Sequence, residues 1–301
     1  MMNQLRRFSR ERQIWLISLP IILWVLVFSY FPMYGLIIAF QNYVPGQTMF
    51  GNWVGLDNFI RFFQEPDFWM IMRNTIVISM LNLLIGFPAP IILALLLNEV
   101  RNRAFKKTIQ SLSYIPYFIS WVVVASIAFT LLGNDGIIND LLQRFGFIHN
   151  PIQFLGEGKY FWAILTSSNV WKDVGFSSII YMSAIAGIDR EQYEAGKVDG
   201  LGRFGLAWHI TLPGIRSTIV LLFILALGGI LNAGFEQQLL LGSPTTRDYY
   251  EVIDTYVYRF GVQFGNYSYG TAVGLMKSLI GLTLVIVANK LSKRYMQTAI
   301  F

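Results

Sequence analysis

The sequence predicts an all-α membrane protein with six transmembrane helices, and three observations lead to that fold class. Of its 301 residues, 54% are hydrophobic and 13% are charged, whereas soluble globular proteins carry about 25% charged residues. The mean hydropathy is +0.51. Four blocks that lack Asp, Glu, Lys and Arg are long enough for the roughly 20 apolar residues that cross a bilayer: 13–56, 74–98, 108–134 and 217–235. A soluble enzyme, a nucleic-acid binder and a disordered chain are therefore excluded.

Four of the six predicted spans, the first, second, third and fifth, coincide with these apolar blocks. The fourth is interrupted by Lys172–Asp173 and the sixth by Lys277. The apolar run of the first is longer than the roughly 7–15 residues of a signal-peptide core, and no convincing small-residue cleavage site accompanies it, so we expect a retained span. The six spans are predicted at 13–40, 69–97, 109–132, 161–187, 216–241 and 268–290.

The distribution of Lys and Arg predicts the orientation of the chain. Basic residues collect before the first span, in the short loop 98–108 and in the carboxyl tail. Because Lys and Arg concentrate in cytoplasmic loops, an even number of spans places all three segments in the cytoplasm. The basic residues are Arg6, Arg7, Arg10, Arg12, Arg101, Arg103, Lys106, Lys107, Lys290, Lys293 and Arg294. Both termini are expected to face the cytoplasm, and residues 1–301 are expected to form a single membrane domain.

The predicted outer loop 41–68 has the composition of an ordered segment. Pro45 and Gly46 turn the chain, and Asp57 is expected to cap a short helix. The helix carries apolar side chains at Phe59, Ile60, Phe62 and Phe63. Two placements remain open: the helix lies in the headgroup region, or it packs against the outer ends of other spans.

Motifs for catalysis or metal binding fail on inspection. Gly200, Gly202 and Gly205 match the dinucleotide fingerprint, but no strand precedes them. The Gly158–Lys159 pair lacks the other residues of a phosphate loop, so an ATP site is not expected. Without cysteine, a disulfide framework, a zinc-thiolate site and an iron–sulfur cluster are excluded, and two isolated histidines, His149 and His209, do not predict a metal centre.

The longest predicted cytoplasmic connection, 189–213, predicts two short helices. Asp189 begins the first, in a capping-box pattern with Gln192. Gly200 and Gly202 suit its end, because glycine accepts the left-handed conformation. A second helix, 203–211, is expected to lead to Pro213, which suits the first turn of the next span.

This loop resembles the signature of the membrane subunits of binding-protein-dependent ABC importers, Glu-Ala-x(4)-Gly-x(9)-Ile-x-Leu-Pro. Asp199 matches the common Asp-Gly pair, and Gly196 stands where the family usually has a second Ala. The matching residues are Glu194, Ala195, Asp199, Gly200, Ile210, Leu212 and Pro213.

Three further stretches resemble the importers of oligosaccharides from complex polysaccharides, such as rhamnogalacturonan and alginate. They are FPMYGLIIAFQNYVPG, WVGLDNFIRFF and YIPYFISWVVVA. The resemblance implies a type I ABC importer permease fold in a bacterial inner membrane. It also implies a heterodimer with a second, homologous permease, two ATPase subunits that bind ATP and magnesium, and an extracytoplasmic binding protein. This chain would bind no cofactor.

The resemblance also implies a coupling mechanism. The helix before Gly200 would dock on an ATPase subunit and transmit its closure to the spans. A shift from 1:99 to 99:1 between two states requires about 5.5 kcal/mol, so a loosely attached helix would not suffice. Glu194 is expected to make polar contacts across this joint, and Gly200 to allow the turn.

Polar residues at membrane depth form the last set of candidates. Charges there are costly and usually face a cavity or a partner. One interpretation is a sugar path with aromatic rings and amides, and the other is internal salt bridges and interhelical hydrogen bonds. The candidates are Trp171, Lys172, Asp173, Asn232, Glu236, Gln237 and Lys277. Gly270 and Gly274 form a G-x-x-x-G pattern that favours close helix packing.

A rival function is a secondary transporter driven by protons or sodium, in which Lys277 and Glu236 would be relay groups. That function does not explain the two helices predicted in the loop 189–213. A polytopic membrane enzyme lacks any cluster of nucleophile, base and metal ligand.

Overall fold

The computed structural model describes residues 12–46 and 51–296, which cluster into two compact units. One takes its residues from Met1–Gln64 and Val257–Met276, and the other from Glu65–Tyr256 and Lys277–Phe301. Arg6, Arg7 and Arg10 of the predicted basic segment lie outside the described residues. The single membrane domain over 1–301 stays a prediction.

The first unit begins with the predicted first span, which is helical throughout its described length. It consists of α2 (Arg12–Val25), the π-helical η1 (Leu26–Tyr30) and the 3-10 helix η2 (Phe31–Phe40). Pro32 stands at the start of η2, where a missing N–H costs least. Most of its described large apolar side chains are exposed, as suits a helix that faces lipid.

The described part of the predicted outer loop folds back onto the end of this span. Strands β1 (Gln41–Asn42) and β2 (Asn52–Trp53) pair antiparallel, with Gln41 opposite Trp53. Helix α3 (Asp57–Gln64) begins at Asp57 itself, so its carboxylate lies in the first turn instead of at the expected capping position. Asn58 Nδ2 donates to the carbonyls of Ala39 at 2.9 Å and Gln41 at 3.0 Å.

Packing therefore accounts for one face of α3. Phe62 is fully buried, and the Phe59 ring lies 5.3 Å from that of Phe40. Ile60 and Phe63 are exposed on the other face. Of the two placements left open by the sequence, contact with the outer end of the first span is present.

The rest of this unit is η7 (Tyr258–Gln263) and the first part of α17 (Tyr267–Met296). A Cβ on Gly270 would lie 2.8 Å from the Cα of Gly261, so the two backbones touch there, while a Cβ on Gly274 would meet nothing within 4 Å. The G-x-x-x-G pattern therefore makes a close contact at its first glycine. Within the unit, Ser268 Oγ accepts from the N–H of Tyr43 at 2.9 Å.

The second unit begins with the predicted second span, which is helical from Phe68 to Glu99. It consists of α4 (Phe68–Leu81), the π-helical η3 (Asn82–Gly86) and α5 (Pro88–Glu99). The π-turn precedes Pro88, which has no N–H for a regular helical bond.

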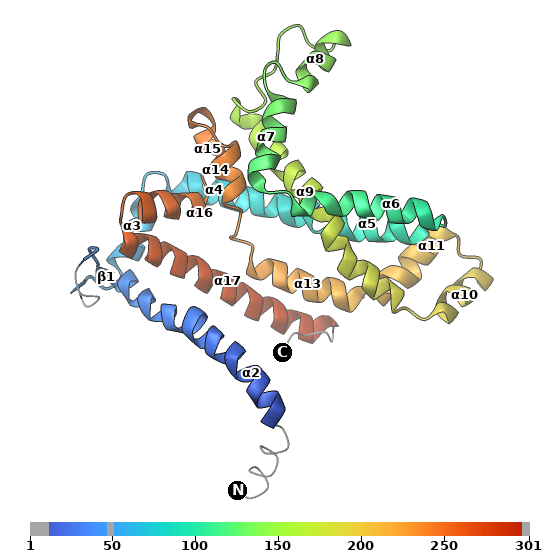
Figure 1. Ribbon diagram of the computed structural model, residues 1–301, viewed down its shortest axis with the longest axis horizontal. Helices are drawn as coiled ribbons and strands as arrows, with labels where there is room; N and C mark the ends of the chain where they lie inside the picture. Colours follow the sequence, from blue (N-terminus) through green and yellow to red (C-terminus); the bar gives the residue numbers. More distant parts are fainter. Residues whose placement is uncertain (1–11, 47–50, 297–301) are drawn as a thin grey trace, which may run out of the picture. The chain divides into compact units, whose positions relative to one another are not determined.

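The predicted third span, 109–132, is wrong as one continuous helix. It comprises α6 (Arg103–Tyr114), η4 (Ile115–Phe118) and α7 (Trp121–Leu132). Pro116 removes a backbone donor, and Ser120 caps a new helix by accepting from Val123 N at 3.4 Å. Figure 1 shows α7 turned away from the direction of α6. Helix α8 (Ile137–Arg144) follows in the connection to α9.

Helix α9 (Gly158–Ala186) corresponds to the predicted fourth span and is unbroken over 29 residues. It packs along α5 and against α6. A Cβ on Gly175 would lie 1.9 Å from the carbonyl oxygen of Ser113, so α9 and α6 touch backbone to backbone there.

The predicted fifth span, 216–241, is also interrupted. Helix α13 (Arg216–Gly228) ends at paired glycines, and α14 (Glu236–Leu241) starts after a non-helical stretch. Gly234 within that stretch has φ +107°, which a helix does not tolerate. The chain continues through η6 (Pro244–Thr246), α15 (Arg247–Tyr250) and α16 (Ile253–Val257), and the second unit ends with the part of α17 that follows Met276.

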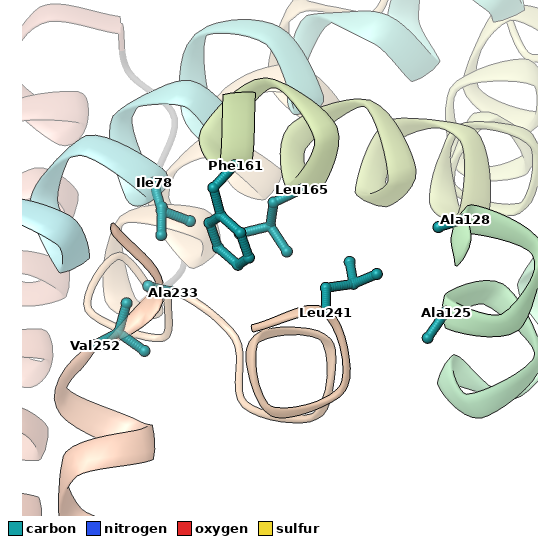
Figure 2. Close-up of a cluster of buried hydrophobic side chains, with 8 residues drawn as sticks. All are labelled: Ile78, Ala125, Ala128, Phe161, Leu165, Ala233, Leu241 and Val252. Atoms are coloured by element: carbon teal, nitrogen blue, oxygen red, sulfur yellow. The ribbon is translucent and has the colours of Figure 1, made fainter. Parts of the chain in front are cut away.

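Two apolar clusters hold the second unit together. Figure 2 shows the first, in which Ile78 of α4 and Phe161 and Leu165 of α9 meet side chains of α7 and α14. The second joins α5, the end of α9 and the start of α13, and consists of Ile91, Ala94, Tyr181, Ile185 and Ile215. On α9 and on the span formed by α4 and α5, the two clusters occupy different stretches of the helix.

Among the described residues, four helical segments are long and apolar enough to cross a membrane. They are Ile14–Phe40, Phe68–Glu99, Trp121–Arg144 and Tyr267–Arg294. A fifth results if Arg203–Gly214 and Arg216–Gly228, bent by 63°, form one span. Helix α9 is as long as these segments but less apolar. The protein is thus a mostly helical membrane protein with four or five apolar spans.

Candidate functional site

The loop between α9 and α13 is an ordered element that follows the spans directly. Helix α10 (Arg190–Val198) begins at Asp189, whose carboxylate accepts from Glu191 N at 3.0 Å. It ends at Gly200, which has φ +82°, with the N–H of Leu201 bonded to Gly196 O at 2.9 Å. The predicted cap and glycine turn are confirmed, and Figure 1 shows α10 beyond the ends of α5 and α6.

Two details of the predicted loop are wrong. Gly202 has φ −72° and caps the next helix instead of ending the first. That helix runs from Arg203 to Gly214, through α11 (Arg203–Leu206), the π-helical η5 (Ala207–Thr211) and α12 (Leu212–Gly214). Pro213 therefore lies in its last turn, and the following span starts at Arg216 after the bend.

Internal contacts fix α10 to the second helix. The hydroxyls of Tyr193 and Thr211 lie 3.0 Å apart, and Thr211 is buried. Gly196 is buried, with Ile210 and Leu206 side chains so near that a Cβ would lie 2.6 Å and 2.9 Å from them. Leu212 packs against the cluster of Ile91 and Ile185 at the ends of the spans. Packed side chains therefore connect α10 to the ends of the spans.

The outer face of this loop is exposed. Glu194, Ala195 and Asp199 are exposed, as are the apolar side chains of Val198, 88% exposed, and Phe204, 82% exposed. The ring of Phe204 lies 6.4 Å from that of Trp208, at 11°. Exposed apolar groups beside carboxylates are typical of a protein contact surface. The motif identified Glu194 and Ala195 but not the three apolar side chains, because it fixes no residue at their positions.

A cleft with a volume of about 500 Å³ lies between α4–α5, α9 and α13–α14. Along each helix it falls between the two apolar clusters: Ile78 precedes it and Ile91 follows it on the second span. Its lining is rich in amides, hydroxyls and aromatic rings. The polar members are Ser79, Asn82, Asn169, Asp173, Ser177, Asn232 and Gln237, and the aromatic members Phe87, Trp121 and Tyr181.

Irregular backbone forms two walls of the cleft. One is the π-turn Asn82–Gly86, and the other is the non-helical stretch 229–235. At membrane depth, non-helical backbone is tolerated only inside protein or beside a water-filled cavity. The sequence did not reveal these walls, because both blocks are apolar enough to predict continuous helices.

Several polar atoms of the lining have no partner in the described part of the chain. Asn169 Nδ2 donates to Asn82 Oδ1 at 3.2 Å, but Asn169 Oδ1 and Ser79 Oγ are buried without a hydrogen bond. Asn169, Asp173 and Ser177 are spaced four residues apart and so share one face of α9. This spacing was a signal in the sequence that would have added Asn169 and Ser177 to the candidates.

Lys172 points out of the cleft and into the break between α6 and α7. It is 8% exposed, and its ammonium donates to the carbonyls of Tyr117 at 2.7 Å, Ile119 at 2.8 Å and Pro116 at 3.4 Å. The rings of Tyr117 and Trp121 lie 5.4 Å and 5.7 Å from it. The Pro116 carbonyl also accepts from Ile119 N at 3.1 Å, so the break frees the carbonyls of Tyr117 and Ile119, and Lys172 supplies their donor.

Of the predicted path residues, Asp173, Asn232 and Gln237 line the cleft, whereas Trp171, Lys172, Glu236 and Lys277 do not. Trp171 is 44% exposed. Glu236 is exposed at the first position of α14.

Lys277 forms an ion pair with Asp254 of α16. Neither of the two acidic candidates at membrane depth, Asp173 and Glu236, is its partner. Asp254 was missed because the loop that carries it was expected to lie outside the membrane-embedded part.

A second polar cluster ties α15 to α4. Arg247 forms ion pairs with Asp67 and with Glu251, the latter at 3.0 Å, and buried Asn74 Nδ2 donates to Glu251 O at 2.9 Å. Burial opposes the charged form, but the hydrogen bonds and charges of Glu251 and Asp67 outweigh it and raise the pKa of Arg247. Arg247 therefore stays charged at any physiological pH.

Comparison with known proteins identifies the family. Residues 86–297 match the model of the binding-protein-dependent transport system inner membrane component. The chain is 46% identical to the polygalacturonan/rhamnogalacturonan transport system permease protein YteP of Bacillus subtilis (strain 168), over 98% of this chain and 92% of that one. It is 44% identical to protein LplB of the same organism, over 97% and 92%.

A solved structure has the same fold. The chain superposes on one from the crystal structure of a bacterial alginate ABC transporter in complex with an alginate pentasaccharide-bound periplasmic protein, with a TM-score of 0.89. The two are 39% identical, and the match covers 98% of this chain and 99% of that one.

The family match covers more than half of the chain, and the relatives are similar along nearly all of it. A permease subunit of this class binds no cofactor, and its partner ATPase hydrolyses ATP. An ion-coupled secondary transporter is thus the wrong class. The chain belongs to the binding-protein-dependent transport system inner membrane components, as a multi-pass permease subunit of an ABC importer.

Proposed function

We propose that this permease imports oligosaccharides and that its cleft is part of the sugar path. The observation that carries the proposal is the cleft lining, in which carboxamides, hydroxyls and aromatic rings lie between two apolar clusters. Carboxamides both donate and accept, as sugar hydroxyls require, and aromatic faces stack on sugar rings. Asp173, Asn232 and Gln237 contribute to this path from the cleft.

The relatives favour fragments of acidic polysaccharides as substrates. The names of the similar proteins refer to polygalacturonan, rhamnogalacturonan and alginate. At 46% and 39% identity along nearly the whole chain, a related substrate class is the natural inference. We therefore take oligogalacturonides as the first substrates to test.

The working complex contains a second, homologous permease, two ATPase subunits and an extracytoplasmic binding protein. This chain crosses the membrane six times, and both termini face the cytoplasm. One of the six spans is α9, which is less apolar than the others. At about 1.5 Å per residue, the 29 residues of α9 exceed the thickness of a core of about 30 Å.

The loop 189–213 docks on an ATPase subunit and couples its closure to the spans. Its exposed face supplies the contact through Glu194, Ala195, Asp199 and Val198. Gly200, Ile210, Leu212 and Pro213 hold its shape and its connection to α13. Trp171, Lys172, Glu236 and Lys277 act outside the cleft, as structural groups.

Transport by the reconstituted complex tests this function. The permease, its partner permease, the ATPase and the binding protein are placed in liposomes, and uptake of an oligosaccharide panel is measured. Uptake should require ATP and should persist when ionophores collapse ion gradients. Uptake that needs an ion gradient but not ATP, or no uptake of any oligosaccharide, would contradict the proposal.

Cysteine labelling tests the topology, because the native chain has no cysteine. Single cysteines at Asn52 and Gly156 should react with an impermeant thiol reagent from outside, and those at Asn102 and Lys197 should not. Labelling at Asn102 from outside would reverse the orientation.

A charge reversal tests the docking face. Glu194→Arg should lower the amount of ATPase that copurifies with the permeases and the substrate-stimulated ATP hydrolysis. Glu99→Arg, a reversal at the end of α5, is the matched control and should leave both unchanged. Full stimulation in the Glu194→Arg complex would exclude the assigned contact.

A further inference from the structure

Asp173 is the single charged side chain among the described residues that line the cleft. It is exposed, and its carboxylate makes no hydrogen bond or ion pair within the described part of the chain. Other carboxylates near membrane depth are used differently, since Asp254 is paired with Lys277. The carboxylate of Asp173 therefore remains available to a molecule in the cleft.

The cations that would neutralise this carboxylate are committed elsewhere. The neighbouring Lys172 directs its ammonium to three backbone carbonyls in the α6–α7 break. Lys277 is held by Asp254, and Arg73 donates to Asn74 Oδ1 at 3.1 Å and to Asp248 O. This chain's side of the cleft thus has an anionic lining without a free cation in the described residues.

The surroundings of Asp173 suit a sugar edge that presents hydroxyl groups. Asn169 and Ser177 lie one turn before and one turn after it on the same face of α9, and Trp121 adds an aromatic ring to the lining. An ionised carboxylate is a pure acceptor, and a hydroxyl donor gives it a short, charge-assisted bond. A second carboxylate brought to the same place is repelled by that of Asp173.

We propose that Asp173 is a specificity-determining residue, which accepts hydrogen bonds from sugar hydroxyls and disfavours a uronate carboxylate at this position of the path. This inference rests on the proposed oligosaccharide function and deepens it. For an acidic oligosaccharide, the groups that receive its carboxylates must then come from outside this chain's cleft, from the partner permease or the binding protein. Because a cleft with low-dielectric walls focuses the field of a charge that lines it, the repulsion between like charges there is measurable.

The test compares two substrates of equal length in the full reconstituted complex: a galacturonate trisaccharide and its fully methyl-esterified, uncharged form. Initial uptake of each is measured with the wild-type permease and with Asp173→Asn, which keeps the shape and removes the charge. The binding protein is the same in both complexes, so its own preference cancels when the acidic-to-neutral ratios are compared. Asp135→Asn, at an exposed position after α7, is the matched control.

Asp173→Asn should raise the acidic-to-neutral ratio by about three- to tenfold in a complex that assembles as the wild type does. The control should leave the ratio at its wild-type value. An unchanged or lowered ratio in a complex that transports both sugars would overturn the role of Asp173 and leave the proposed function standing. A wild-type complex that transports no oligosaccharide would overturn both.

Discussion

The loop 189–213 holds its two helices with hydrogen bonds of its own, whereas the cleft has polar atoms without protein partners among the described residues. In the loop, Asp189 caps α10 and Tyr193 meets Thr211. In the cleft, Asn169 Oδ1 and Ser79 Oγ are buried without a hydrogen bond, and the Asp173 carboxylate has no hydrogen bond within the described part of the chain. In the proposed function, the loop must keep one shape to couple ATPase closure to the spans. The cleft must instead keep polar groups free to form hydrogen bonds with a sugar.

The neighbours Lys172 and Asp173 show the same contrast within two residues of α9. The ammonium of Lys172 is held by backbone carbonyls, and the carboxylate of Asp173 is available in the cleft. Successive residues on a helix differ by about 100° in direction, so adjacent charges can serve opposite purposes. Their proximity in sequence says nothing about a shared role.

The largest effect is expected from Lys172→Met. Removal of the ammonium leaves carbonyls in the α6–α7 break unpaired, at about 1–3 kcal/mol for each that finds no other donor. Thermal unfolding of the purified permease complex in detergent should show a clearly lowered midpoint, and Asp173→Asn should not. If both variants unfold at the wild-type midpoint, Lys172 does not stabilise the break and the contrast between the two residues is wrong.

The next effect is expected from the ion pair of Lys277 and Asp254. Loss of either charge leaves the other without its partner in a partly buried site, which costs about 1–3 kcal/mol. Lys277→Met should reduce uptake of acidic and neutral oligosaccharides equally, because the pair lies outside the cleft lining. The double variant Lys277→Met with Asp254→Leu should recover part of the stability. Selective loss of acidic substrates would instead place Lys277 in the path.

A smaller cost is expected at the glycine turn of the loop. Gly200 has φ +82°, so Gly200→Val imposes a left-handed conformation on a β-branched residue, at about 1–2 kcal/mol. Substrate-stimulated ATP hydrolysis should fall while the spans stay folded. Gly202→Ser is the matched control, since Gly202 has φ −72° at a helix cap, where serine is favoured. Equal losses of ATP hydrolysis in both variants would mean that any substitution in the loop is harmful, and would contradict a specific role of the left-handed turn at Gly200.

The loop was more predictable from the sequence than the cleft, for a physical reason. Capping and glycine turns depend on residues within one or two turns of each other, so Asp189 and Gly200 were placed correctly. The cleft is assembled from three spans, and its walls depend on the π-turn Asn82–Gly86 and the break at 229–235, both within strongly apolar blocks. Apolar composition predicts burial in the membrane but does not reveal where a helix breaks.

The partner of a buried charge was equally inaccessible to the sequence. Asp254 lies 23 residues from Lys277, in a segment predicted to lie outside the spans, and only the fold brings them together. Lys172 is satisfied by backbone carbonyls, which leave no mark in the sequence. Pro116, which has no N–H for a regular helical bond, was a local sign that the helix changes near this point.

The smallest effect is expected from Gly196→Ala, which tests whether the loop is packed as tightly as the spans. The new Cβ would lie 2.6 Å from Ile210 Cδ1 and 2.9 Å from Leu206 Cδ2, both ends of flexible side chains that can move. Alanine gains about 1 kcal/mol of helix propensity over glycine, which offsets that repacking, so stability and ATPase copurification should change by less than a measurable amount. Gly175→Ala is the matched contrast, because its Cβ would lie 1.9 Å from the carbonyl oxygen of Ser113, which is backbone and cannot turn aside. That variant should lower the melting midpoint of the complex strongly. If Gly196→Ala is as damaging as Gly175→Ala, the loop is as intolerant as the α6–α9 contact, and its shape depends on close packing more than on caps and turns.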